Sequence, residues 1–353
     1  TEYNTGLDAT FLKGKLRFTV DVYQKYVKDL LQPKVKMPTT IGYGNGYQIS
    51  YMNSGKMTNK GWEFRVDAVP FQNKDWRVGV YFNIAHNENK ITEMPDNYIE
   101  ENYTFGNGNY AYRREGRPMG SFYGYRYKGV YQNKDATYAR DIEGNVMKDI
   151  SGNAIVMRNG SYTVAPGDAI YEDVNHDGVI NQYDIVYLGN SNPRLTGGAG
   201  LNVSYKQFKL SAIFYGRYGQ DVVNATRLNN ESMRGIDNQS TAVLRRWRNE
   251  GDQTDIPRAL YGEGYNTLGS DRFVEDASYL RLKSLSFTYR LPKKAIQRWG
   301  FNNIDVYVTG YNLFTWTNYT GQDPEVKTEN TYAKDTATTP ASIQLVAGFN
   351  LSF

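Results

Sequence analysis

The chain of 353 residues contains no cysteine, which excludes disulfides, thiolate metal sites and cysteine nucleophiles. Histidine is almost as scarce, since His86 and His176 are the only two, and a histidine-rich metal site is therefore not expected. No run of about 18 apolar residues occurs, and the mean hydropathy of −0.65 is too low for a membrane protein built from helices. These shortages exclude several common kinds of site and one class of membrane protein.

Catalytic motifs are also missing. No serine lies in a Gly-x-Ser-x-Gly elbow, and no His-Glu-x-x-His motif is present. The 41 basic and 37 acidic residues are mixed along the chain, and the net charge of +4 is too small to indicate nucleic-acid binding. The chain opens at Thr1 without the pattern of a signal peptide. We therefore expect no enzyme and no nucleic-acid partner, and either a processed start or a piece of a larger protein.

Tyrosine is the residue in greatest excess. Thirty-one tyrosines, 15 phenylalanines and 5 tryptophans bring the aromatic content to 14%. Tyrosine and tryptophan suit places that are apolar at one end and wet at the other, such as membrane girdles and sugar-binding surfaces. The tyrosine-, glycine- and asparagine-rich segments 41–47 and 103–112 are candidates for holding sugars, or else for packing loops together.

Segments that alternate apolar and polar residues recur along the chain, whereas segments with a helical period are scarce. In the most regular one, 343–353, every second residue is apolar and the residues between them are mostly polar or small. The others lie at 16–22, 62–68, 76–84, 208–214, 285–291 and 304–308. The spacing between these segments leaves room for further strands, so about nine strands are expected in total. The predicted fold class is all-β.

The connections between these strands alternate in length. Short ones lie at 13–15, 72–74 and 206–207, a modest turn spans 292–303, and long ones span about 30–48, 89–197, 217–278 and 313–342. Antiparallel strands joined in this way place all short turns at one end and all long loops at the other, as in a transmembrane antiparallel β-barrel of the outer membrane. A soluble β-sandwich also alternates, but loops of this length are rare in compact soluble domains. Because single-chain bacterial barrels have an even number of strands, a count of about nine indicates the C-terminal part of a larger barrel or one chain of a split barrel.

The stretch D-V-N-H-D-G-V-I-N-Q-Y-D, residues 173–184, has the spacing of a calcium loop. Gly178 stands at the sharp turn, and Ile180 stands where such loops bury an apolar side chain. The predicted ligands are Asp173, Asn175, Asp177, Val179 through its carbonyl, Asn181 and Asp184. We expect structural Ca²⁺ that pins an extracellular loop; the alternative is a turn rich in Asp, Asn and Gly without an ion.

One further motif is basic. The segment L-R-R-W-R, residues 244–248, could be a short helix whose charges bind an acidic ligand or are simply solvated.

Several of these runs resemble SusC/RagA-type TonB-dependent transporters. D-A-S-Y-L-R-L-K-S-L at 276–285, ending in Y-R-L-P at 289–292, is similar to their late-barrel signature. Further similar runs lie at 59–63, 123–125, 166–168, 306–314 and 319–325, and the chain ends on Phe353. Together these runs cover most of residues 1–353 in the family's order.

The resemblance implies a 22-stranded barrel with an N-terminal plug, of which only part of the barrel is represented here. Residues 1–353 would be the C-terminal part of that barrel, with the plug absent and 89–197 as a long extracellular excursion carrying the 173–184 loop. It further implies import of an oligosaccharide or peptide across the cell outer membrane. The implied partners are a SusD-like lipoprotein, TonB acting through the missing plug, the remaining N-terminal barrel portion and outer-membrane lipid.

Two other functions remain open. The first is a secreted, calcium-stabilised, β-rich glycan-binding or adhesin module. The second is a β-sheet glycoside hydrolase, which needs two carboxylates roughly 5–10 Å apart. The apolar face of the strands separates barrel from sandwich: a charge at Leu345 or Val306 should cost about 2–4 kcal/mol near the middle of a membrane, whereas a sandwich buries that face in its core.

Overall fold

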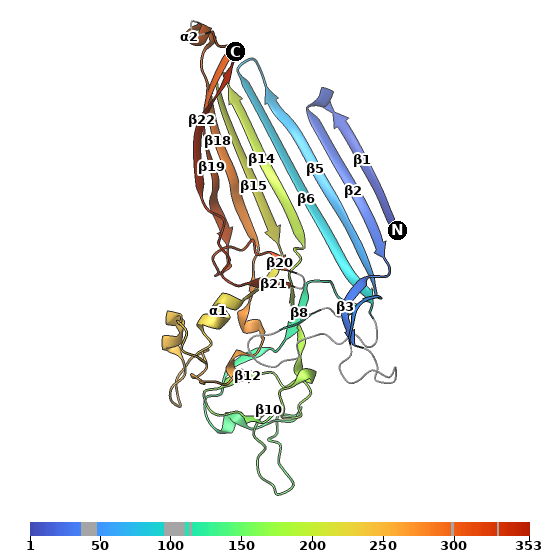
Figure 1. Ribbon diagram of the computed structural model, residues 1–353, viewed down its shortest axis with the longest axis vertical. Coiled ribbons are helices and arrows are strands. Elements are labelled where there is room, and N and C mark those ends of the chain that lie inside the picture. The colour runs from blue at the N-terminus through green and yellow to red at the C-terminus, as the bar shows by residue number, and fades with distance from the viewer. Residues whose placement is uncertain (37–47, 95–109, 113–114, 298–299, 330–331) are drawn as a thin grey trace.

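The computed structural model describes residues 1–36, 48–94, 110–112, 115–297, 300–329 and 332–353. Its main element is one antiparallel sheet in the order β1-β2-β5-β6-β14-β15-β18-β19-β22 (Figure 1). The nine strands are β1 (Glu2–Phe11), β2 (Leu16–Val27), β5 (Lys56–Gln72), β6 (Trp76–Glu93), β14 (Leu195–Tyr205), β15 (Phe208–Tyr218), β18 (Tyr279–Arg290), β19 (Asn303–Thr317) and β22 (Gln344–Ser352). The prediction of an all-β chain with about nine antiparallel strands is confirmed.

The register gathers the apolar side chains of neighbouring strands on one face of this sheet. Val308 of β19 lies opposite Phe287 of β18 and Ala347 of β22, and Phe287 lies opposite Leu210 of β15. These side chains stay accessible: Phe287 is 48% exposed and Val308 is 44% exposed. A barrel turns such a face to lipid, whereas a sandwich would cover it with a second sheet.

The other face carries polar side chains that bond across the strands. The Ser211 hydroxyl donates to the Asn202 side chain at 2.8 Å, and Ser286 and Thr309 share a hydrogen bond of the same length. Arg290 donates to Asp305 at 2.7 and 2.9 Å. The carboxylates that alternate along the strands are therefore explained by a wet face, without any need for catalysis.

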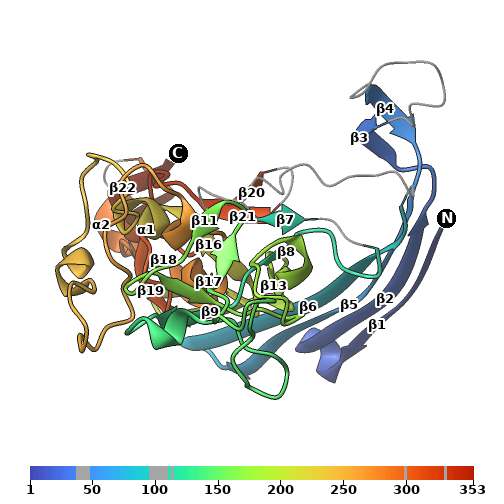
Figure 2. The same cartoon turned by 90° about the horizontal axis from the view of Figure 1, so that it is seen from below.

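The two ends of the sheet differ. Figure 1 shows the C-terminus and the short turns at one end and the loop-borne elements at the other. Figure 2 shows that the sheet is curved and that these elements lie toward its concave side. Arg281, on the polar face of β18, donates to Asp323 and Glu325 of the β19–β22 connection, which identifies the polar face as the concave one.

The connections contain short elements of their own. The strands are β3 (Leu31–Lys36), β4 (Gln48–Asn53), β7 (Ala111–Tyr112), β8 (Ser121–Gly124), β9 (Tyr127–Val130), β10 (Arg158–Asn159), β11 (Tyr162–Thr163), β12 (Ala169–Tyr171), β13 (Val186–Asn190), β16 (Asp221–Asn224), β17 (Val274–Asp276), β20 (Thr328–Glu329) and β21 (Tyr332–Asp335). The helices are α1 (Ala225–Asn230) and α2 (Lys293–Ile296), with 3₁₀ turns η1 (Leu12–Gly14), η3 (Asp135–Thr137), η4 (Gln182–Asp184), η5 (Thr241–Arg245), η6 (Tyr265–Thr267) and η7 (Asp271–Phe273). None of the helices among the described residues is long and apolar enough to cross a membrane.

The largest buried cluster lies in these connections and not on the sheet. It joins residues from the β6–β14 and β15–β18 connections: Tyr125, Tyr131, Ala139, Met157, Val164, Ala169, Tyr171, Ile180, Tyr265 and Leu268. The long connections therefore fold against one another around their own core, which offsets the entropy lost in ordering them.

Glycines on the polar face make room for tyrosine rings of the neighbouring strand. Tyr81 of β6 lies opposite Gly200 of β14, and a Cβ atom on Gly200 would come within 2.0 Å of the Tyr81 ring. Gly348 is covered by Tyr307 in the same way. An aromatic ring over a glycine shields the bare backbone and fixes the register of the two strands.

Replacing Gly200 with alanine should therefore destabilise the sheet by about 1–3 kcal/mol, because the added methyl group forces the Tyr81 ring to move. Gly79 of β6 is the matched control, since the nearest atoms to a Cβ there lie 4.0 Å away. Urea unfolding of the refolded protein measures both variants. Equal midpoints for G200A and G79A would contradict the role given to the tyrosine.

Candidate functional site

The predicted calcium loop forms a compact series of turns held by its own side chains. Asp173 accepts hydrogen bonds from the backbone N–H groups of Asp177 and Gly178, at 3.2 and 2.8 Å. Asp177 accepts from the Val179 N–H at 2.8 Å and from the Asn175 amide at 2.9 Å. The Asn181 amide donates to the Val179 carbonyl at 3.1 Å, so the first five predicted ligands lie in one series of turns.

The sixth predicted ligand, Asp184, points inward and is completely buried. Its two carboxylate oxygens accept from the N–H groups of Val174 and Asn181, each at 2.8 Å, so that it closes the loop on itself. Burial raises the pKa of the Asp184 carboxyl. As expected, Ile180 beside it is also completely buried.

The calcium site stays a prediction. Across the part of the chain that the structure describes, no group of three or more His, Cys, Asp or Glu side chains is arranged to hold a metal ion. Three of the six predicted ligands are amide or carbonyl groups. They are not His, Cys, Asp or Glu side chains and do not count toward such a group. The donor chemistry suits a hard cation, and backbone hydrogen bonds to Asp173 already shape the turn.

Of the two candidate sugar-binding segments, 41–47 and 103–112, the structure describes only the end of the second. Segment 41–47 and residues 103–109 lie outside the described residues. Tyr110 is described and is 2% exposed, in contact with the rings of Phe122 and Tyr332, and its hydroxyl donates to the Ser270 carbonyl at 2.8 Å. Tyr110 therefore packs the loops together, which was the alternative interpretation for these tyrosines.

The basic segment 244–248 only partly overlaps a helix, since η5 spans Thr241–Arg245. Arg246 and Arg248 donate to backbone carbonyls of their own segment, Val243 at 3.3 Å and Leu244 at 3.4 Å. These contacts favour a local structural role over capture of an acidic ligand.

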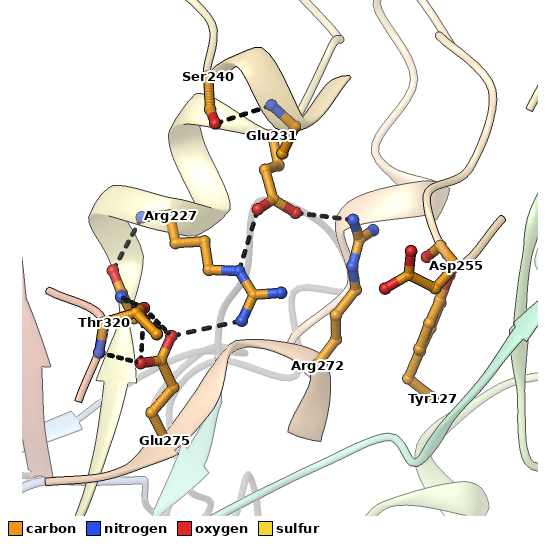
Figure 3. A network of polar contacts seen from close by, with 10 residues as sticks. Tyr127, Arg227, Glu231, Ser240, Asp255, Arg272, Glu275 and Thr320 are labelled. Atoms are coloured by element: carbon orange, nitrogen blue, oxygen red, sulfur yellow. Dashed lines mark hydrogen bonds and ion pairs between the residues drawn. The ribbon is translucent and has the colours of Figure 1, made fainter. Parts of the chain in front are cut away.

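A buried charge network joins two long connections and could hardly be predicted from the sequence. Figure 3 shows the Glu231 carboxylate between two guanidinium groups, with Arg227 at 3.0 Å and Arg272 at 2.8 Å. The side chains of Glu231 and Arg272 are each 6% exposed. Only the four-residue spacing of Arg227 and Glu231 on α1 could have been read from the sequence.

The network continues through Glu275, which accepts from Arg227 at 3.3 Å and from the backbone and hydroxyl of Thr320 (Figure 3). Thr320 lies in the β19–β22 connection, so the network ties that connection to the β15–β18 connection. On its other side the Arg272 guanidinium stacks over the Tyr127 ring at 5.2 Å. Burial raises the pKa of Tyr127 to about 12, so its hydroxyl remains a donor, here to the Asp255 carbonyl.

A second buried group joins the β6–β14 and β15–β18 connections. Asp168 is completely buried and accepts from the Arg258 guanidinium at 2.7 Å and the Tyr162 hydroxyl at 2.8 Å. The Asn266 amide also donates to it, at 3.3 Å. Together with the first network, this fixes three long connections to one another at the end of the sheet.

A half-open cavity of about 950 Å³ lies where the β19–β22 connection meets the concave face. Arg217 of β15 lines it from the sheet. The remaining wall comes from the β19–β22 connection: Asp323, Glu325, Val326, Lys327, Tyr332, Lys334, Asp335, Thr336, Thr338, Thr339, Pro340 and Ala341. The cavity thus lies at the loop-bearing end of the polar face.

Comparison with known proteins places the chain among receptors and transporters, not enzymes. It is 32% identical over 337 residues to TonB-dependent receptor P3 of Formosa agariphila, covering 93% of this chain and 31% of that protein. It is 28% identical over 363 residues to TonB-dependent receptor SusC of Bacteroides thetaiotaomicron, covering 100% and 32%. The chain thus spans about a third of the length of these curated relatives.

Solved structures agree with the sequence relatives. The RagAB peptide transporter matches 100% of this chain and 35% of its own chain, with a TM-score of 0.72 and 28% identity. The RagAB peptide importer in the open-open state matches with the same TM-score and 27% identity. No protein-family model matches the chain.

Proposed function

Because the chain belongs to the SusC/RagA type of TonB-dependent receptors, we propose that it forms the C-terminal part of the barrel of an outer-membrane nutrient importer. The observation that carries this proposal is the nine-stranded sheet with an exposed apolar face and a polar concave face. A membrane barrel needs both faces, one against lipid and one against the water-filled interior. The N-terminal part of the barrel would complete the sheet at its free edges, β1 and β22.

The long connections then stand on the extracellular side. In this proposal residues 89–197 form an extracellular excursion, and a SusD-like lipoprotein covers the loop-borne elements. The similarity to SusC and to the RagAB peptide transporter supports a lipoprotein partner on this side. TonB would act through a plug that belongs to the remainder of the receptor.

The imported nutrient is an oligosaccharide or a peptide in this proposal. A similar solved structure is of a peptide transporter, and the aromatic content of the chain is compatible with either class. The concave cavity beside Arg217 is the described feature that such a solute would meet.

Membrane fractionation followed by mass measurement of the detergent-extracted complex tests the proposal. We expect the protein in the outer-membrane fraction, in a complex with a plug-bearing portion and a lipoprotein. A soluble, monodisperse particle would overturn the proposal and favour a secreted binding module.

We also propose that the 173–184 loop holds structural calcium. Adding EDTA to the receptor should then speed proteolysis within this loop, and Asp177→Ala should remove the effect of EDTA because a carboxylate ligand is lost. Asp149→Ala is the matched control, since Asp149 holds a similar turn, with Ser151 and Asn153, outside the calcium-type loop. If EDTA leaves the rate of cleavage unchanged in the unsubstituted receptor, the turn is held by hydrogen bonds alone.

A further inference from the structure

The charges around the 950 Å³ cavity fall into two groups. Three carboxylates line it, and each is already engaged by protein donors. Glu325 accepts from Arg281 and Lys283, both at 2.9 Å, and Asp323 accepts from Arg281 and the Ala341 N–H. Their acceptor capacity is therefore largely used within the protein.

The third carboxylate, Asp335, is turned away from solvent. It is 5% exposed and accepts from the Tyr319 hydroxyl at 2.6 Å and from the Ala337 N–H at 2.9 Å. A ligand in the cavity would therefore find no free carboxylate among these three groups.

The three cations of the same wall differ from these carboxylates, because they are not paired within the described part of the wall. Among the side chains that the structure describes, Arg217, Lys327 and Lys334 form no ion pair with a carboxylate. The Arg217 guanidinium donates to the Tyr215 hydroxyl at 3.1 Å, and it extends from the concave face of β15. Lys327 and Lys334 are exposed and enter the cavity from the β19–β22 connection.

Hydroxyl donors complete this wall. Thr336, Thr338 and Thr339 line the cavity beside Lys334. Cations without a carboxylate, together with hydroxyl groups, form the donor set that recognises carboxylates through charge-assisted hydrogen bonds. Among the described side chains of the wall and the partners Arg281 and Lys283, five are cations and three are carboxylates, which leaves an excess of positive charge.

We infer that this cavity binds an anionic solute, and that the nutrient imported by this receptor carries carboxylate groups. The inference rests on the proposed function, because it assigns a charge to the imported solute. Two sources share this chemistry: a peptide rich in aspartate or glutamate, and an oligosaccharide of uronic acids. Arg217 holds the solute from the barrel wall, while Lys327 and Lys334 hold it from the extracellular connection.

Calorimetric titration of the complete detergent-extracted receptor complex tests the inference with two pairs of probes. One pair is a hexaglutamate peptide and a hexaserine peptide; the other is a hexamer of galacturonic acid and a hexamer of glucose. We expect at least one acidic probe to bind ten times more tightly than its neutral counterpart, and to weaken as salt is raised. Binding of the peptide alone or of the uronate alone identifies the source.

The variant K327Q/K334Q should weaken acidic-probe binding at least fivefold. Both side chains are exposed, so the fold is expected to tolerate the change. The matched control is K134Q/K148Q, which removes the same charge from exposed lysines of the β6–β14 connection. Equal binding of acidic and neutral probes, no binding of either acidic probe, or equal effects of the two variants would each overturn the inference.

Failure of the inference is distinguishable from failure of the proposed function. A receptor that fractionates with the outer membrane but prefers neutral probes keeps its function and loses the anionic solute. A protein that is absent from the outer membrane loses the proposed function itself.

Discussion

Alanine in place of Glu231 is expected to loosen the long connections by about 3–5 kcal/mol. The substitution leaves the Arg272 guanidinium, 6% exposed, without the carboxylate that it contacts at 2.8 Å. An uncompensated buried charge costs more than the loss of an ordinary hydrogen bond, because the desolvation penalty remains when its partner is gone. Arg227 loses its 3.0 Å partner on the same carboxylate.

Native-state hydrogen exchange of the whole receptor measures this effect, since it reports local opening of the connections separately from the barrel. Amides near α1 and η7 should lose protection in the E231A variant. Glu88→Ala is the matched control, because the Lys60–Glu88 pair has side chains 64% and 48% exposed and such pairs contribute about 0–1 kcal/mol. Protection that falls equally in both variants would contradict a special role for the buried network.

Arginine in place of Val308 is expected to destabilise the folded barrel by about 2–4 kcal/mol if this residue lies near the middle of the membrane. Val308 lies on the apolar face between Phe287 and Ala347 and is 44% exposed. A charge there would have to enter the hydrocarbon. In a protein that is not in a membrane, the same exposed position would accept arginine at little cost.

Asn350→Arg provides the matched control on the opposite face. Asn350 of β22 lies opposite Asp305 of β19, so an arginine there meets water and a carboxylate. Urea unfolding of the refolded receptor in lipid vesicles should separate the two variants clearly. If V308R is as stable as N350R, the apolar face does not contact lipid.

Much of the sheet could be predicted from the sequence, because side chains of a strand alternate between two faces and this period is a local property. The alternating segment 304–308 falls within β19, and 285–291 overlaps β18. Boundaries were less accurate: β5 and β6 run well beyond the segments predicted for them. Burial of Ile180 could also be predicted, since position and residue type in a turn motif determine it locally.

The role of a tyrosine in a loop could not be predicted from the sequence. Composition alone could not decide whether Tyr110 faces a sugar or packs a loop. The answer depends on Phe122, 12 residues further along the same connection, and on Tyr332 of the β19–β22 connection. The charge networks could not be predicted from the sequence either. Arg272 and Glu231 are 41 residues apart, and Arg258 and Asp168 are 90 residues apart, with no local pattern that joins them.

The sequence by itself therefore determined the strands, the order of short and long connections, and the presence of one apolar and one polar face. These features depend on side-chain period and spacing, which neighbouring residues encode. Only the tertiary structure decided which charges are paired within the connections and which remain free around the concave cavity. Pairing depends on distances between residues that are far apart in the chain, and the fold alone sets those distances.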